Sequence, residues 1–167
     1  MKKKYLFILS VSIYFLSLLF VGFYASFDVS NVVTRGIFLV LIGPFYLMYG
    51  GAALTWFANP LIWMSWILKK NNLLSLIFSS LSLSLALCFM GFDIVNKAGT
   101  CQGTDWQTNP CDAQIFELGI GYYLWVLSIG IFALKNLLQS EMNLNSNNRA
   151  LNAFKKGLND AFPPSKE

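Results

Sequence analysis

The sequence of 167 residues contains no histidine, and lysine, arginine, aspartate and glutamate together make up only 12% of it. Without histidine the chain lacks the commonest general base and the commonest metal ligand of proteins. An average soluble domain carries roughly 25% charged residues. So few charged residues could not cover the surface of a soluble fold of this size. The lack of histidine and the low charge therefore both argue against a soluble enzyme.

Catalytic and cofactor-binding motifs are also missing. The sequence has no G-x-G-x-x-G, P-loop, H-E-x-x-H, C-x-x-C or catalytic-triad candidate. Asp105 and Asp112 lie in one loop, but two carboxylates fall short of the roughly six to eight oxygen ligands that calcium takes. We therefore predict no catalytic residue, no cofactor and no metal site, and we expect that the protein is not an enzyme.

Apolar residues are abundant, at 56% of the chain, and they gather in four long runs. A membrane helix needs about 20 mainly apolar residues. We therefore predict an all-α integral membrane fold over residues 1–138, a four-crossing helical bundle whose second element is kinked or split. The runs lie at residues 5–25, 36–68, 73–94 and 115–138.

The first run, Tyr5–Ala25, follows three lysines and could be a signal peptide. Its apolar stretch exceeds the roughly 7–15 residues usual in signal peptides, and Phe23 stands where a cleavage site requires a small residue. We expect this run to be retained as a span.

The second run, Gly36–Leu68, is too long for one straight span. It is interrupted by Pro44, Gly50–Gly51 and Asn59–Pro60. Asparagine before proline is typical of a helix N-cap followed by the first helical position. In one arrangement residues 36–58 cross the membrane and an interfacial turn follows. In the other, which we favour, residues 36–49 lie in the outer leaflet and the next segment crosses.

The charges give the bundle an orientation. If the N-terminus is cytoplasmic and there are four crossings, only Arg35 and Lys97 among the basic residues lie outside. Cytoplasmic loops carry an excess of lysine and arginine, so we predict a bacterial inner-membrane protein with both termini in the cytoplasm and loop 95–114 in the periplasm. The net charge of +4 then reflects the membrane, and we expect no nucleic acid as partner. The inner basic residues are Lys2, Lys3, Lys4, Lys69, Lys70, Lys135, Arg149, Lys155, Lys156 and Lys166.

Two cysteines, Cys101 and Cys111, lie in the predicted periplasmic loop. That compartment is oxidising, so we expect a disulfide, which contributes about 2–3 kcal/mol in the chain-entropy model. Small four-span oxidoreductases of the DsbB type have this size and topology, but they need a second external cysteine pair to pass electrons to quinone. Cys88 lies inside an apolar run and suits a small buried hydrophobe. We favour a structural disulfide over a redox centre.

Partner contacts are expected at two places. Trp106, with Asp105 beside it, lies within the loop that the disulfide closes, and an exposed aromatic on a constrained loop suits recognition. Trp56, Asn59 and Pro60 could frame a ligand groove. We prefer a simpler interpretation of these three residues, in which the tryptophan is an interfacial anchor and Asn59–Pro60 cap the start of a helix.

Small residues recur at helical spacing in the third run, at Ser75, Ser79, Ser82 and Ala86. Small residues allow membrane helices to approach closely. We predict a packing face here, and we consider a pore lining the weaker alternative because hydroxyls alone make a poor selectivity filter.

The segment 139–167 is polar, and we predict a cytoplasmic tail with an amphipathic helix over 147–162. Ser146 is the expected N-cap, and Pro163–Pro164 end the pattern. Such a helix could lie on the anionic leaflet or dock a partner, and a solvated tail is the alternative. Its apolar face consists of Leu151, Phe154, Leu158, Ala161 and Phe162.

One combination of features carries a resemblance. The W-x-A-N-P run at Trp56–Pro60, the basic turn at Lys69–Lys70, the serine/leucine-rich span and G-Y-Y-L-W at Gly121–Trp125 together resemble small uncharacterised bacterial inner-membrane proteins. The resemblance implies a bacterial inner membrane and no activity.

These observations predict a protein that acts by binding, as an accessory, assembly or immunity-type protein. Its expected partners are the lipid bilayer and another membrane protein or toxin, and its oligomeric state stays open. The alternatives are a DsbB-like membrane thiol oxidoreductase and a small channel or carrier subunit.

The predicted topology can be tested with a membrane-impermeant thiol reagent. After reduction, Cys101 should be labelled in intact spheroplasts, because loop 95–114 is expected in the periplasm. Labelling that occurs only after lysis would invert the topology.

Overall fold

The computed structural model describes residues 3–27, 30–47, 51–96 and 112–161. The chain is mostly helical, as predicted. In chain order the elements are α1 (Lys3–Leu19), β1 (Val21–Phe27), β2 (Ser30–Arg35), α2 (Gly36–Tyr46), the 3-10 helix η2 (Gly51–Phe57), α3 (Ala58–Ile67), α4 (Asn72–Cys88), the 3-10 helix η3 (Phe89–Gly91), β3 (Ile94–Asn96), β4 (Asp112–Leu118) and α5 (Ile120–Ala161).

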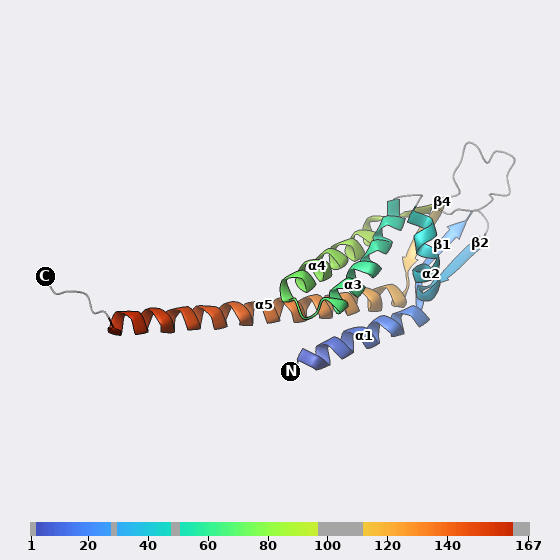
Figure 1. Ribbon diagram of the computed structural model, residues 1–167. Coiled ribbons are helices and arrows are strands. Elements are labelled where there is room, and N and C mark those ends of the chain that lie inside the picture. Colours follow the sequence, from blue (N-terminus) through green and yellow to red (C-terminus); the bar gives the residue numbers. More distant parts are fainter. Residues whose placement is uncertain (1–2, 28–29, 48–50, 97–111, 162–167) are drawn as a thin grey trace.

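The prediction of an all-helical fold is wrong, because an antiparallel sheet in the order β2-β1-β4-β3 closes one end of the helical bundle (Figure 1). The first apolar run leaves the helix after Leu19 and continues as β1, and the fourth run begins as β4 and becomes helical only at Ile120. Short apolar segments rich in aromatic and β-branched residues have the same hydropathy as helical ones. Pairing across the sheet satisfies their backbone groups instead.

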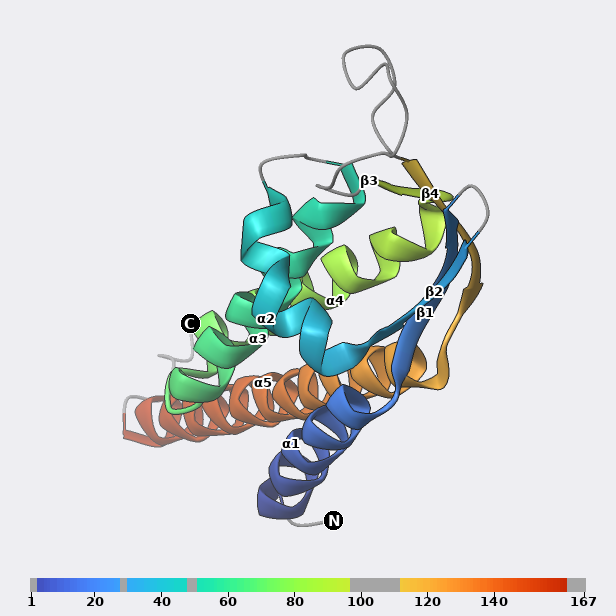
Figure 2. The same cartoon turned by 90° about the vertical axis from the view of Figure 1, so that its right-hand side faces the viewer.

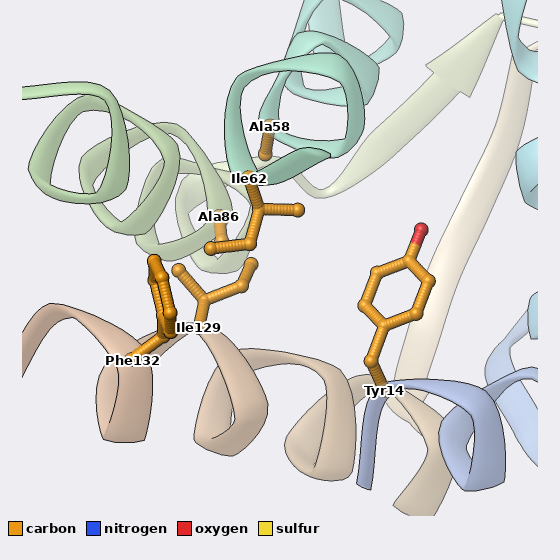
Figure 3. Close-up of a cluster of buried hydrophobic side chains, with 6 residues drawn as sticks. All are labelled: Tyr14, Ala58, Ile62, Ala86, Ile129 and Phe132. Carbon is orange, nitrogen blue, oxygen red and sulfur yellow. The ribbon is translucent and has the colours of Figure 1, made fainter. Parts of the chain in front are cut away.

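Four helices, α1, α3, α4 and α5, pack into the bundle, and its core draws on all four (Figure 3). The cluster is built around Ile62 of α3 and Ile129 of α5, both fully buried. The sheet lies where α1 ends and α5 begins (Figures 1 and 2). The core cluster contains Tyr14, Ala58, Ile62, Ala86, Ile129 and Phe132.

The second apolar run is split as predicted. Its halves, Gly36–Tyr46 and Gly51–Ile67, meet at 111°. Pro44 lies inside α2, so the break falls after it. Gly51 has a φ of 56°, a backbone conformation that glycine adopts without steric cost. At the sheet end, α2 runs across the direction of the bundle (Figure 1).

The predicted packing face on α4 is confirmed, since Ser75, Ser79, Ser82 and Ala86 are all fully buried. The Ser82 hydroxyl donates to the Ala58 carbonyl of α3 over 2.7 Å. Cys88, which we expected to be buried, is exposed. Two positions after Ala86, it lies roughly 200° further round the helix and faces outward.

Basic residues gather at the end of the bundle opposite the sheet. The Lys69 ammonium lies 4.3 Å from the centroid of the Phe7 ring, which places the α3–α4 turn beside the start of α1. The sheet end carries Arg35 in β2, Asp93 before β3 and Glu117 in β4, all exposed. Lys69 and the charged residues of the sheet end are therefore separated along the length of the bundle.

Two helical segments are long and apolar enough to cross a membrane, Asn72–Gly91 and Ile120–Phe154. The bent pair of α2 with η2 and α3 would be a third if it counts as one span. The apolar helix α1 is shorter.

The last helix, α5, continues without a break through Ala161. Ser146 therefore lies inside a helix, and the prediction that it caps a separate tail helix is wrong. Residues 147–161 are helical, but as the continuation of α5. Beyond Asn136 the side chains described on α5 are half-buried or exposed, and the helix extends past the bundle (Figure 1).

The packing face on α4 gives a stability test. We expect Ser82→Leu to lower the free energy of unfolding by about 1–3 kcal/mol, because added bulk must be placed in a tightly packed site. The matched change Ser84→Leu, on the exposed side of the same helix, should leave stability nearly unchanged. Thermal unfolding in detergent, followed by tryptophan fluorescence, measures both. Equal midpoints for the two variants would contradict the packing role.

Candidate functional site

A buried side-chain amide, that of Asn59, connects three helices. Asn59 is 5% exposed. Its Oδ1 accepts hydrogen bonds from the Tyr14 hydroxyl of α1 at 2.9 Å and from Trp125 Nε1 of α5 at 3.0 Å. Its Nδ2 donates to the Trp56 carbonyl at 3.3 Å. A buried amide is costly unless its donors and acceptors are paired, and here both of its atoms are used.

Tyr14 extends this network to two further aromatic residues of α3. Its hydroxyl accepts from Trp63 Nε1 at 3.0 Å while it donates to Asn59. The Trp66 ring meets the Tyr14 ring edge-on, with 5.1 Å between centroids. Within the part of the chain that the structure describes, buried Trp66 Nε1 has no hydrogen-bond partner. Trp66 is instead held by packing, through this ring contact and against the core cluster.

The N-cap role predicted for Asn59 is wrong. Helix α3 begins at Ala58, its N-cap is Phe57 in a right-handed helical conformation, and no side chain caps it. Because η2 leads directly into α3, the Asn59 side chain is free to reach across the bundle. Pro60 falls in the first turn of α3, where a missing N–H costs no helical hydrogen bond.

A cavity of about 350 Å³ lies next to Asn59 at the sheet end of the bundle. Its walls come from α2, from η2, from the neighbouring strands β1 and β2, and from the first turns of α5. Among its lining residues are Phe23, Val33, Leu39, Trp56, Tyr122 and Trp125. The volume falls within the range of small-ligand sites, roughly 300–1,000 Å³.

Three polar side chains around this cavity bond to the protein itself. Trp56 Nε1 donates to the Val40 carbonyl, and the Tyr122 hydroxyl donates to the Ala86 carbonyl at 2.6 Å. Thr55 Oγ1 donates to a carbonyl one turn earlier in η2. With these hydrogen bonds made internally, the wall presents mainly hydrocarbon and aromatic surface.

Gly43 allows α2 to close over the cavity. A Cβ atom at this position would overlap the Trp56 indole ring, so any larger residue would push α2 away from η2. The contact positions the indole for its hydrogen bond to Val40.

A second buried polar cluster lies further along the bundle, between α4 and α5. Asn136 Nδ2 donates to the hydroxyls of Ser75 at 2.9 Å and Ser79 at 3.1 Å. Lys135, only 6% exposed, donates from Nζ to Asn136 Oδ1 and stands over the Phe132 ring. From the sequence Lys135 was predicted only as one of the inner basic residues, although two adjacent polar residues in an apolar run are a signal for such a cluster.

The structure brings together part of the predicted site. Trp56, Asn59 and Pro60 lie beside the cavity or next to it in the chain, where Tyr14 and Trp63 join them. Neither of these two was singled out from the sequence, although a tyrosine in the middle of an apolar run is a signal. At the start of α5, Tyr122 is buried, whereas Tyr123 is exposed. The predicted site residues Cys101, Asp105, Trp106 and Cys111 lie outside the described residues.

No group of three or more cysteine, aspartate or glutamate side chains that could hold a metal occurs among the described residues. Comparisons of the chain with protein-family models, with curated proteins and with solved structures give no match.

The Asn59 network gives a second stability test. Asn59→Leu should lower the free energy of unfolding by about 1–3 kcal/mol for each donor left without its acceptor, here the Tyr14 O–H and the Trp125 Nε1–H. Combined with Tyr14→Phe, the loss should be smaller than the sum of the two single losses, because the residues share one hydrogen bond.

Exposed Asn145→Leu on α5 is the control and should leave the unfolding midpoint unchanged. Strict additivity of the Asn59 and Tyr14 changes would show that the two side chains do not act as one network.

Proposed function

We propose that the protein is a multi-pass protein of a bacterial inner membrane that acts by binding and not by catalysis. Its cavity is the binding site, and the ligand that it receives is the hydrocarbon chain of a lipid or lipid-like molecule. The observation that carries the proposal is an apolar cavity of about 350 Å³ in a protein whose outer surface is itself rich in large exposed apolar side chains.

A hydrocarbon chain suits this cavity better than a peptide backbone does. The polar groups at Trp56, Tyr122 and Trp125 already have protein partners. A peptide entering the cavity would bring N–H and C=O groups that need hydrogen bonds, and leaving them unpaired is costly. A lipid chain brings none. Large exposed side chains on α2, such as Leu41 and Phe45, would contact the lipid that surrounds the protein.

The topology proposed with this function has four crossings, by α1, by η2 with α3, by α4 and by α5, and both termini are cytoplasmic. The separation of Lys69 from Arg35, Asp93 and Glu117 along the bundle supports it. At 17 residues, α1 is roughly 25 Å long. A short first crossing is tolerated where lysines such as Lys4 extend to the interface. The cavity then lies in the outer half of the membrane.

In the cell we propose an accessory, assembly or immunity-type role, with another membrane protein or a membrane-active toxin as the protein partner. The cavity lies on the side from which a toxin would arrive if the sheet end faces the periplasm. Trp106 and Asp105 remain the residues that we expect to contact such a partner. Crosslinking pull-down from the native membrane should recover one specific protein, and recovery of none would count against this role.

Cavity filling tests the lipid site. Ala53 lines the cavity, so Ala53→Phe should exclude a chain from it. In liposomes containing a phospholipid with a photoreactive group near the end of its acyl chain, the wild-type protein should be labelled at Trp56 and Tyr122. The variant should lose this labelling several-fold, and mass spectrometry locates the labelled residues.

The matched control is Ala133→Phe, at a half-buried alanine of α5 outside the cavity lining, and it should keep wild-type labelling. Labelling that Ala53→Phe leaves unchanged, or that occurs only on outward residues such as Phe45, would contradict a lipid chain in the cavity.

A further inference from the structure

The part of α5 beyond the bundle carries an apolar stripe. Leu137, Leu144 and Leu151 follow one another at intervals of seven residues, and Leu158 continues the interval in the sequence. Leu137, Leu144, Leu151 and Phe154 are between 48% and 67% exposed. These large side chains have no covering element in the part of the chain that the structure describes.

A seven-residue interval is the repeat of a coiled coil. At about 3.5 residues per turn, residues seven apart lie on one line along the helix, and residues three further on complete the seam. Here the second set of positions holds Ser140, Asn147 and Phe154. We call the exposed leucines with these three residues the α5 seam.

We propose that the α5 seam pairs with the same seam of a second copy of this chain, as a parallel two-stranded coiled coil. Two copies with one topology in one membrane point the same way, so parallel pairing is the only orientation open to them. In register, Leu144 meets Leu144 and Leu151 meets Leu151. Their burial drives the association.

The polar and charged residues fit self-pairing. An Asn147 amide both donates and accepts, so it can bond to the Asn147 of the other copy, and a polar residue within the seam fixes the register of coiled coils. Glu141 and Arg149 lie off the seam, so no like charges face each other along it. The α5 seam is therefore compatible with itself in charge and in hydrogen bonding.

The continuity of α5 argues against the bilayer surface as the occupant. The helix passes from the bundle into its extension without a break, and Figure 1 shows the extension pointing away from the bundle. Residues 139–161 extend it by roughly 35 Å. To lie on a leaflet, the helix would have to bend sharply where it leaves the bundle. Two bundles in one bilayer also hold their extensions close together, which raises their effective concentration.

Fluorescence energy transfer tests this pairing. Full-length copies carrying a donor or an acceptor fluorophore at the C-terminus are mixed in liposomes, and energy transfer is followed as lipid dilutes the protein. The seam variant Leu144→Asp/Leu151→Asp should weaken self-association by about a hundredfold, because each copy loses two buried leucines and gains two facing charges.

The control variant Asn145→Asp/Asn152→Asp adds the same charges one residue away, at exposed positions outside the seam, and should stay close to wild type. Tryptophan fluorescence of both variants should match that of the wild type, since the changes lie outside the bundle. Wild-type transfer no higher than that of dispersed non-interacting proteins, or equal losses in both variants, would overturn the proposal. Neither outcome affects the lipid site, which is tested separately.

Discussion

The fold depends on the hydrogen bonds of one buried side chain, the amide of Asn59. It joins α1 through Tyr14, η2 through the Trp56 carbonyl and α5 through Trp125. In a low-dielectric interior each of these bonds is strong, and each unpaired partner would be costly. Polar contacts of this kind, together with the close approach of helices at small residues, select one arrangement of the bundle.

Internal hydrogen bonding also determines the character of the cavity wall. Hydroxyls and indoles that could have faced a ligand instead bond to backbone carbonyls, as Tyr122 does to Ala86 and Trp56 does to Val40. The wall left over is hydrocarbon and aromatic. A site of this kind selects its ligand by shape and by the absence of polar groups. This chemistry accords with a binding role and with a lipid chain as occupant.

The two ends of the bundle differ in their charged residues and in their exposed surfaces. The sheet end presents Arg35, Asp93 and Glu117 together with the cavity beneath α2, whereas the opposite end presents lysines and the projecting part of α5. Helix α5 connects the two; it is packed over its first turns, and its side chains that the structure describes from Glu141 onward are exposed. The ligand site and the self-association surface that we propose are thus far apart on one element.

The sequence by itself determined the apolar runs, the break in the second one and the small-residue face at Ser75, Ser79, Ser82 and Ala86. These follow from composition and periodicity, which are local properties. It misassigned β1 and β4, because hydropathy does not distinguish a buried strand from a helix. Only the tertiary structure decided that Asn59 binds Tyr14 and Trp125 instead of capping its helix, and that Trp56 closes a cavity with Gly43. Those contacts join residues distant in sequence, and no local pattern encodes which partner a buried polar group will meet.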